Sequence, residues 1–224
     1  MSELPYGWIT ASVDDLRSAS PNSITDGPFG SNLKTSHYTS SGPIVIRLGN
    51  IGSRGFIDND RAHISPEHFA VLKKHHVFGG DILVAALGEP IGRACLLPDE
   101  IQPALVKADC FRFRPAEEFN ASYLMLWFNS EDARAKFLAA SHGLGRVRIN
   151  LTDFRNTQVP IAPLPEQRRI VAKIDSLSAK SKRAHEHLDH IPRLAEKYKQ
   201  EILTAAFRGE LPKADKTKDR EGGL

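Results

Sequence analysis

The chain has 224 residues, of which 41% are hydrophobic and 25% charged, and its formal net charge is +3. This composition is typical of a globular protein, and no run of about 18 apolar residues could form a transmembrane helix. Cys95 and Cys110 are the two cysteines, too few for a disulfide scaffold or a four-ligand zinc site. The first residues do not resemble a secretory signal, so we expect a reduced, cytoplasmic protein.

The first 165 residues predict a mixed α/β fold. Short apolar runs rich in β-branched residues alternate with turn residues, as expected for strands buried in a sheet. The expected strands cover residues 43–48, 81–86, 93–97, 104–114 and 157–161.

Helices are expected where a polar capping residue precedes an apolar run. Ser65 followed by Pro66 predicts a helix start, because serine accepts a hydrogen bond from a free amide of the first turn and proline fits the first helical position. The other expected caps are Asn120 before 121–129, Ser130 before 131–141 and Thr152 before a short turn.

A proline-rich connector follows this region. Pro160, Pro163 and Pro165 make the chain stiff and are unsuited to a helix interior. We therefore expect one domain over residues 1–165, a helical region over 166–210 and a disordered polar tail over 211–224.

The helical region carries a narrow apolar stripe, which we call the seam. Its spacings alternate between 4 and 3 residues, the heptad pattern of a coiled coil. The seam consists of Ile170, Ile174, Leu177, Ser181, Ala184, Leu188, Ile191, Ala195, Tyr198, Ile202 and Ala205. Pro192 predicts a kink or a break near its middle. Because a solitary helix of about 40 residues is not stable, the narrow seam favours pairing with another chain over docking on its own domain.

The seam residues expected to contact a partner helix are the larger ones. They are Ile170, Ile174, Leu177, Leu188, Ile191, Tyr198 and Ile202.

Motifs of common catalytic sites are absent from the sequence. It has no Walker phosphate loop, no Gly-x-Ser-x-Gly elbow, no His-Glu-x-x-His pair and no adenine-methyltransferase or nuclease motif. His187 and His190 could share a helix face, but a metal ion would need a third ligand. We therefore assign no catalytic residue and no metal site.

Charge is distributed unevenly along the chain. From Glu166 onward there are 14 basic and 10 acidic residues, which leaves 16 basic and 17 acidic residues before it. A DNA-binding surface within the first 165 residues must therefore arise from clustering of basic side chains.

A glycine-containing stretch from Asp26 to Lys34 could bind phosphate. Its small residues would let backbone amides approach, and Asn32 and Lys34 could donate to phosphate oxygens. A tight structural turn with Phe29 in the core is an equally good interpretation.

Two further loops carry charged residues suited to DNA. Arg146 and Arg148 would project to one side of an extended segment and could grip phosphates or guanine edges, unless the segment is a solvated strand edge. Glu89 and Arg93 could read cytosine and guanine, or form a local ion pair. The complete set of expected DNA-contacting residues is Asn32, Lys34, Arg47, Glu89, Arg93, Lys107, Arg146, Arg148 and Asn150.

Seven sequence stretches stand in an order typical of one protein family. They are LPYGW at 4–8, DGPFGSNLK at 26–34, VIRLGNIG at 45–52, GDILVAALGEPIGRACLLP at 80–98, VKADCFRFRP at 106–115, RINLTDFRNTQVPIAPLPEQRRIVAKID at 148–175 and EILTAAFRGEL at 201–211. In this combination the chain resembles the DNA specificity subunit of Type I restriction–modification systems over nearly its whole length.

The resemblance implies a target recognition domain followed by a long helix that acts as a spacer and as a docking surface. Subunits of this family perform no chemistry themselves, so no cofactor is expected on this chain. The expected partners are double-stranded DNA, methyltransferase subunits that bind S-adenosylmethionine and methylate adenine, and a restriction subunit that uses ATP and Mg²⁺.

The usual specificity subunit has two recognition domains and two helical regions, roughly double this length. The chain therefore resembles one half of a subunit, and we expect two copies to pair their helices antiparallel and read an interrupted palindrome. Pairing with a different half is an alternative. Others are a truncated remnant or structural adaptor that assembles complexes without reading DNA, and an enzyme whose site we do not recognise.

Overall fold

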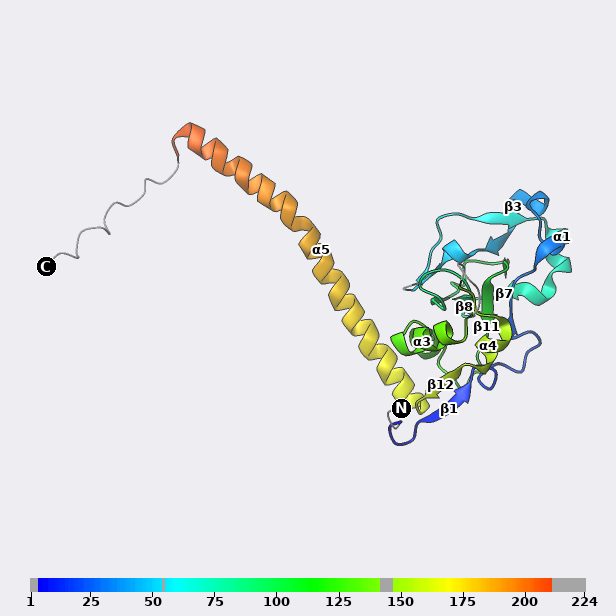
Figure 1. The fold of residues 1–224 in the computed structure, drawn as a ribbon. Helices are drawn as coiled ribbons and strands as arrows, with labels where there is room; N and C mark the ends of the chain where they lie inside the picture. Colours follow the sequence, from blue (N-terminus) through cyan, green and yellow to red (C-terminus); the bar gives the residue numbers. More distant parts are fainter. Residues whose placement is uncertain (1–3, 54, 142–146, 211–224) are drawn as a thin grey trace. The chain divides into compact units, whose positions relative to one another are not determined.

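The computed structural model describes residues 4–53, 55–141 and 147–210, and divides into two compact units (Figure 1). The first unit ends at Ala172 and the second begins at Lys173. The first unit combines sheets with short helices, and a long helix, α5 (Leu164–Arg208), follows the last strand. The predicted mixed α/β class with a long C-terminal helix is confirmed.

Two four-stranded sheets form the frame of the first unit. The first has the order β6-β3-β10-β7 and the second has the order β2-β11-β8-β9. β3 and β10 pair in parallel, whereas the other pairs in these sheets are antiparallel. Their bounds are β2 (Ile24–Thr25), β3 (Tyr38–Ile46), β6 (Ala62–Ile64), β7 (His76–Val77), β8 (Ile82–Ala85), β9 (Ala94–Leu96), β10 (Ala104–Val106) and β11 (Cys110–Phe113).

Two small antiparallel pairs complete the strands. β1 (Ile9–Ser12) pairs with β12 (Gln158–Ile161), and β4 (Ile51–Gly52) pairs with β5 (Gly55–Phe56). β3, β7 and the helix α1 (Pro66–Val71) lie at one end of the first unit, and β1 and β12 lie at the other (Figure 1).

The helices of the first unit begin at polar caps, as expected. Ser65 accepts from the amide of His68 at the start of α1, and the side-chain oxygens of Asn120 and Ser130 cap α2 and α3 in the same way. The remaining helices are α2 (Ala121–Phe128), α3 (Glu131–Ala139), α4 (Leu151–Asn156) and the 3-10 helices η1 (Gly30–Asn32), η2 (Thr35–His37), η3 (Leu48–Asn50) and η4 (Lys73–His75).

Several sequence predictions about these elements were wrong. The expected strand 104–114 is two strands, because the chain turns at Asp109, whose φ of 68° lies in the left-handed region. Asn150, not Thr152, caps α4. The helix α5 continues through Pro192, which excludes a break there, whereas the alternative of a kink stays a prediction.

Aromatic side chains fill the largest core of the first unit. Phe154 lies 5.2 Å from Phe111 and 5.5 Å from Phe128, measured between ring centroids. Phe113 and Phe137 complete the group, and all five rings are buried. This cluster joins the helices α2, α3 and α4 to β11, and therefore fixes the loops that follow the strands.

The first turns of α5 belong to the first unit. Gln167 is only 1% exposed; it accepts from the Asn120 amide at 2.9 Å and donates to the Ala162 carbonyl at 2.8 Å. Ile170 and Val171 pack partly against the aromatic core. From Lys173 onward nearly every residue is exposed. The predicted domain limits at 165 and 210 stay predictions. No helix among the described residues is long and apolar enough to cross a membrane.

Candidate nucleic-acid interface

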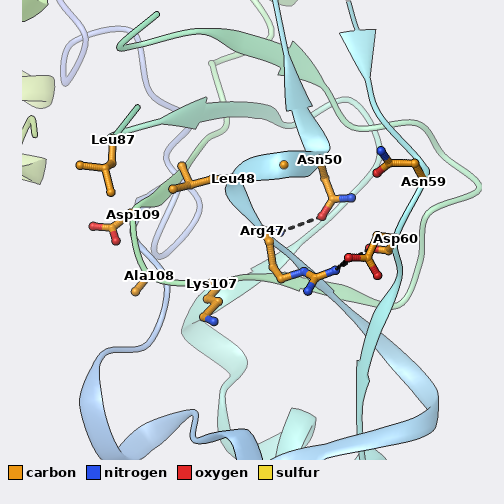
Figure 2. Close-up of a pocket in the computed structure, with 10 residues that line it drawn as sticks. Arg47, Leu48, Asn50, Asn59, Asp60, Leu87, Lys107, Ala108 and Asp109 are labelled. Atoms are coloured by element: carbon orange, nitrogen blue, oxygen red, sulfur yellow. Dashed lines mark hydrogen bonds and ion pairs between the residues drawn. The ribbon is translucent and has the colours of Figure 1, made fainter. Parts of the chain in front are cut away.

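A groove of about 510 Å³ opens where four loops of the first unit meet (Figure 2). The loops follow β3, precede β6, follow β8 and connect β10 to β11. The residues that line the groove are Arg47, Leu48, Gly49, Asn50, Asn59, Asp60, Leu87, Lys107, Ala108 and Asp109. Two of the predicted DNA-contacting residues, Arg47 and Lys107, therefore lie together in one site.

Arg47 is held in place by the two loops on either side of it. Its Nη2 donates to the Asp60 carbonyl at 2.8 Å and pairs with the Asp60 carboxylate at 2.5 Å, as Figure 2 shows. The side chain of Asn50 accepts from the Arg47 amide and donates to the Ile57 carbonyl, both at 2.9 Å. Asn50 is buried and joins the two loops through these hydrogen bonds, and both Asn50 and Asn59 line the groove.

Asn59 supplies an exposed polar side chain to this groove. Its amide has no hydrogen-bond partner among residues 4–53, 55–141 and 147–210. An asparagine amide can bind adenine through two hydrogen bonds in the major groove.

The Lys107–Asp109 turn forms the floor of the groove. Gly27 packs directly against the main chain of this turn. A Cβ atom added to Gly27 would lie 1.9 Å from the Lys107 carbonyl carbon. Only glycine permits this close approach. Part of the Asp26–Lys34 stretch therefore serves to let two main-chain segments pass close to each other. Lys107 places its Nζ atom 5.7 Å from the centre of the Tyr38 ring, a cation–π contact.

Arg148 contacts the Lys107–Asp109 turn from outside the set of residues that lines the groove. Its Nε atom lies 2.9 Å from an Asp109 carboxylate oxygen, and its guanidinium lies 4.9 Å from the centre of the Phe29 ring. Arg148 also pairs with Leu87 through an isolated β-bridge. The interpretation that places Phe29 in the core was wrong, since Phe29 is 41% exposed and contacts this arginine.

Arg93 donates to main-chain oxygens of segments that contribute to the groove. Its Nε donates to the Ile51 carbonyl at 2.7 Å and its Nη2 to the Leu48 carbonyl at 2.9 Å. A longer contact of 3.4 Å joins Nη1 to the Pro90 carbonyl. The arginine thus ties the loop after β8 to the 3-10 helix η3, and both contribute walls to the groove.

The other predicted contacts lie elsewhere. Glu89 forms an ion pair with Arg134, not with Arg93 as the alternative had it. Asn150 caps α4 by accepting from the Asp153 amide at 2.8 Å. Asn32 and Lys34 are exposed around η1 and η2, outside the set of residues that lines the groove. Arg146 lies outside the described residues.

Cys95 and Cys110 are buried, and neither lines the groove. Burial raises the pKa of the Cys95 thiol to about 12 and raises the pKa of Cys110 as well. Both cysteines are therefore protonated at neutral pH and pack as apolar side chains. Among the described residues, no group of three or more histidine, cysteine or carboxylate side chains could hold a metal ion.

Sequence reasoning missed the acceptors of the site. Asp60 forms an ion pair with Arg47 and Asp109 forms one with Arg148, and Asn59 lines the groove beside Asp60 (Figure 2). The sequence gives one weak signal for them, which is that each stands in a polar loop directly beside a strand. Their long-range partners follow only from the tertiary fold.

Comparison with known proteins identifies relatives of this chain. A family model described as the Type I restriction modification DNA specificity domain matches residues 37–193. The match covers more than half of the chain and includes every loop that lines the groove.

Individual relatives agree with the family model. The chain is 29% identical to the Type I restriction enzyme EcoBI specificity subunit of Escherichia coli over 169 residues, which is 75% of this chain and 35% of that subunit. It superimposes on the HsdS subunit from Thermoanaerobacter tengcongensis with a TM-score of 0.65 at 20% identity, covering 94% of this chain and 47% of that one. A chain from a structure of complex assembly in the type I R-M system gives a TM-score of 0.67 at 19% identity, covering 94% and 48%. The chain thus spans half or less of the length of these relatives.

Proposed function

The chain belongs to the family of Type I restriction modification DNA specificity domains, and we propose that its first unit reads a half-site of double-stranded DNA through the groove. Family membership supports sequence-specific DNA recognition as the general role. The finer assignment concerns which residues do the reading, and which assembly presents them.

The groove supports this proposal because it combines donors and acceptors at fixed positions. Arg47 and Lys107 supply positive charge for phosphate or guanine edges, and Asn59 supplies a donor and an acceptor for a base edge. Asp60 and Asp109 hold neighbouring arginines and could accept from cytosine amino groups. Specific readout needs such ordered hydrogen-bonding groups, whereas charge alone gives only non-specific binding.

Arg93 has a positioning role in this proposal instead of a direct contact. Its donors are directed at the Ile51, Leu48 and Pro90 carbonyls, so it acts on DNA through the loops that carry Arg47 and Leu87. Arg148 is a direct contact at the edge of the groove. Asn32, Lys34, Glu89, Arg146 and Asn150 stay predictions as DNA contacts.

The seam of α5 is the proposed site of assembly. Leu177, Leu188, Ile191, Tyr198 and Ile202 are all exposed, and they continue the heptad pattern beyond the first unit. Exposed apolar side chains at coiled-coil spacing are stabilised by burial against another helix. We propose that two copies pair through this seam and present two half-sites, so that the target is an interrupted palindrome.

The chemistry of the assembly is proposed to lie on other subunits. The relatives are named as specificity subunits of restriction enzymes, which supports a recognition role for this chain. Methyltransferase subunits with S-adenosylmethionine, and a restriction subunit with ATP and Mg²⁺, are the proposed partners, with no cofactor on this chain.

Enrichment of a random duplex library by the purified chain tests this function. We expect recovery of an interrupted palindrome, by the chain alone or with a co-expressed methyltransferase. The variant Arg47→Ala with Lys107→Ala should lose the preference, because it removes both groove cations. Arg17→Ala with Lys136→Ala is the matched control, since it also removes two cations and these residues pair with Asp14 and Asp132 outside the groove.

The outcomes separate the alternatives. An asymmetric half-site would keep the recognition role and assign the second half-site to a different chain. No enrichment in either condition, together with complex formation, would support a structural adaptor and contradict DNA recognition.

A further inference from the structure

Three basic residues in the second unit share one face of α5. Lys173, Lys180 and Arg183 are separated by 7 and 3 residues, and at 100° per residue they lie within an arc of about 80°. We call them the basic stripe. On the same face, Ser176 lies between Lys173 and Lys180, and His187 follows Arg183. This face therefore carries no carboxylate over residues 173–187.

The acidic residues of the same span lie on the opposite side of the helix. Asp175, Glu186 and Asp189 stand roughly 160–220° away from Lys173 by the same helical geometry. Lys182 lies on that acidic side. The positive charge of the basic stripe is therefore segregated, although the helix as a whole is only mildly basic.

The members of the basic stripe are uncompensated within the described structure. Among residues 4–53, 55–141 and 147–210, no carboxylate forms an ion pair with any of the three, and Arg183 makes only a 3.3 Å contact to the Ala179 carbonyl of its own helix. Further along, Lys197 pairs with Glu201 at 3.7 Å and Lys199 with Glu196 at 3.9 Å. The lysines near the C-terminal end of α5 thus form ion pairs within the helix, whereas the basic stripe does not.

The basic stripe runs beside the seam and does not coincide with it. Each member stands one residue before a seam position: Lys173 before Ile174, Lys180 before Ser181 and Arg183 before Ala184. One residue corresponds to about 100° around the helix, and four residues to about 40°, so Lys173 and Lys180 flank the seam beside Leu177 and Ala184. A helix packed on the seam would therefore leave the basic stripe at the rim, open to solvent and to a ligand.

We propose that Lys173, Lys180 and Arg183 bind the phosphate backbone of duplex DNA, outside the base pairs that the groove reads. The proposal rests on the function proposed above. The basic stripe is about 15 Å long, and duplex DNA carries a negative charge about every 1.7 Å of its axis, so several phosphates fall within reach of it. Flexible, exposed lysines suit phosphate, which needs a positive charge and no directional readout.

Salt dependence of DNA binding tests the proposal on the full chain. We would replace Lys173, Lys180 and Arg183 by glutamine and measure the affinity for a random-sequence duplex and for the enriched target by fluorescence anisotropy. Each lost phosphate contact should lower the slope of log affinity against log salt by about 0.9, so we expect a reduction of about 2 to 3 and at least tenfold weaker binding at low salt. The sequence preference should not change.

A matched triple variant removes the same charge from the other side of the helix. Lys182→Gln with Arg193→Gln and Lys199→Gln lowers the net charge by three as well, and all three residues lie about 80° or more from every member of the basic stripe. Glutamine favours helix, so circular dichroism should show equal helix content in both variants.

The results distinguish this proposal from the proposed function. An unchanged salt slope in the stripe variant, with sequence preference intact, would overturn the stripe proposal alone. Equal losses in both triple variants would also overturn it, because bulk charge would then be the cause. Loss of methyltransferase binding without loss of DNA affinity would assign the stripe to an acidic protein surface and overturn it too. Absence of sequence preference in the unmodified chain would contradict the proposed function. The salt slope measured with the random duplex would still test whether the basic stripe binds phosphates.

Discussion

The cations around the groove and the cations on α5 differ in what holds them. Arg47 is fixed by Asp60 and Arg148 by Asp109, at 2.5 and 2.9 Å. Lys173 and Lys180 have no such partner among the described residues. The first set is held by carboxylates of the tertiary structure before any ligand arrives, whereas the second set is exposed.

This difference separates two ways of binding a polyanion. An ordered side chain has already lost its rotamer freedom, so directional hydrogen bonds can discriminate between bases. A free lysine attracts phosphate from any direction, and salt screens that attraction. Changes in the first unit should therefore alter selectivity and stability, whereas changes on the helix should alter salt-dependent affinity.

The largest effect is expected from the aromatic core, which keeps the loops of the groove in place. Phe154→Ala should lower the free energy of unfolding of the first unit by about 3–5 kcal/mol, because it leaves a cavity among four buried rings. Urea unfolding followed by tryptophan fluorescence measures this unit alone, since Trp8 and Trp127 both belong to it.

Phe207→Ala provides the control for this measurement on the helix. Phe207 is 91% exposed and lies off the seam, so its removal should change the fluorescence transition by less than about 0.5 kcal/mol. A loss below about 1 kcal/mol for Phe154→Ala would show that the aromatic cluster does not stabilise the first unit as the packing indicates.

A smaller effect is expected at Arg93, and it should appear in selectivity. Arg93→Met leaves the Leu48 and Ile51 carbonyls without their charged donor, so the loops of the groove should lose their fixed positions. Hydrogen bonds to charged groups contribute about 1.5–3 kcal/mol, which corresponds to a roughly 10- to 100-fold loss of affinity for the enriched target. Affinity for a random duplex should stay within about twofold, and Arg93→Lys should recover part of the loss.

The ratio of target affinity to random-duplex affinity distinguishes positioning from general destabilisation. Arg17→Met removes an exposed arginine of the same unit and should leave this ratio unchanged. An unchanged ratio in Arg93→Met would contradict the positioning role. An equal loss on both duplexes would indicate that Arg93 contacts phosphate directly.

Local patterns predicted most of the fold, and long-range geometry accounts for what they missed. Asn120 and Ser130 cap helices where the sequence indicated, because a cap depends on residues only three positions apart. The strand expected over 104–114 failed at Asp109, since the turn there is stabilised by a salt bridge to Arg148 far along the chain. At Pro192 the sequence predicted a kink or a break, and the helix continues there without a break.

The candidate site was predicted only in part for a related reason. Charge and loop placement identified Arg47 and Lys107, which meet in the groove, and Arg148 at its edge. Charge and loop placement could not show that Arg93 donates to main-chain carbonyls instead of facing a ligand. Its partners Leu48 and Ile51 are more than 40 residues away in sequence. Asn59 was missed because nothing in its local sequence marks an amide that faces a groove.

The smallest expected effect depends on pH and connects the floor of the groove to a buried histidine. The Nδ1 atom of His75 lies 2.5 Å from the Asp26 carbonyl, so His75 holds the segment that crosses behind Lys107. Burial, followed by the nearby charges of Lys74 and Arg112, lowers the pKa of His75 below its ordinary value of 6.5, although its contact with Asp26 acts in the opposite direction. The unfolded chain therefore takes up a proton on this residue at a higher pH than the folded chain does.

Stability of the first unit should fall as the pH is lowered below about 6.5, and this fall should level off at the lower pKa of the folded state. One proton can contribute at most about 1.4 kcal/mol per pH unit. His75→Asn keeps a donor for Asp26 but cannot titrate, so urea midpoints at pH 7.5, 6.5 and 5.5 should vary less than in the unmodified chain. His187→Gln on the exposed helix should leave the pH dependence as it is. A pH dependence of equal slope in His75→Asn would assign the effect to other groups, and the groove floor would then be independent of this histidine.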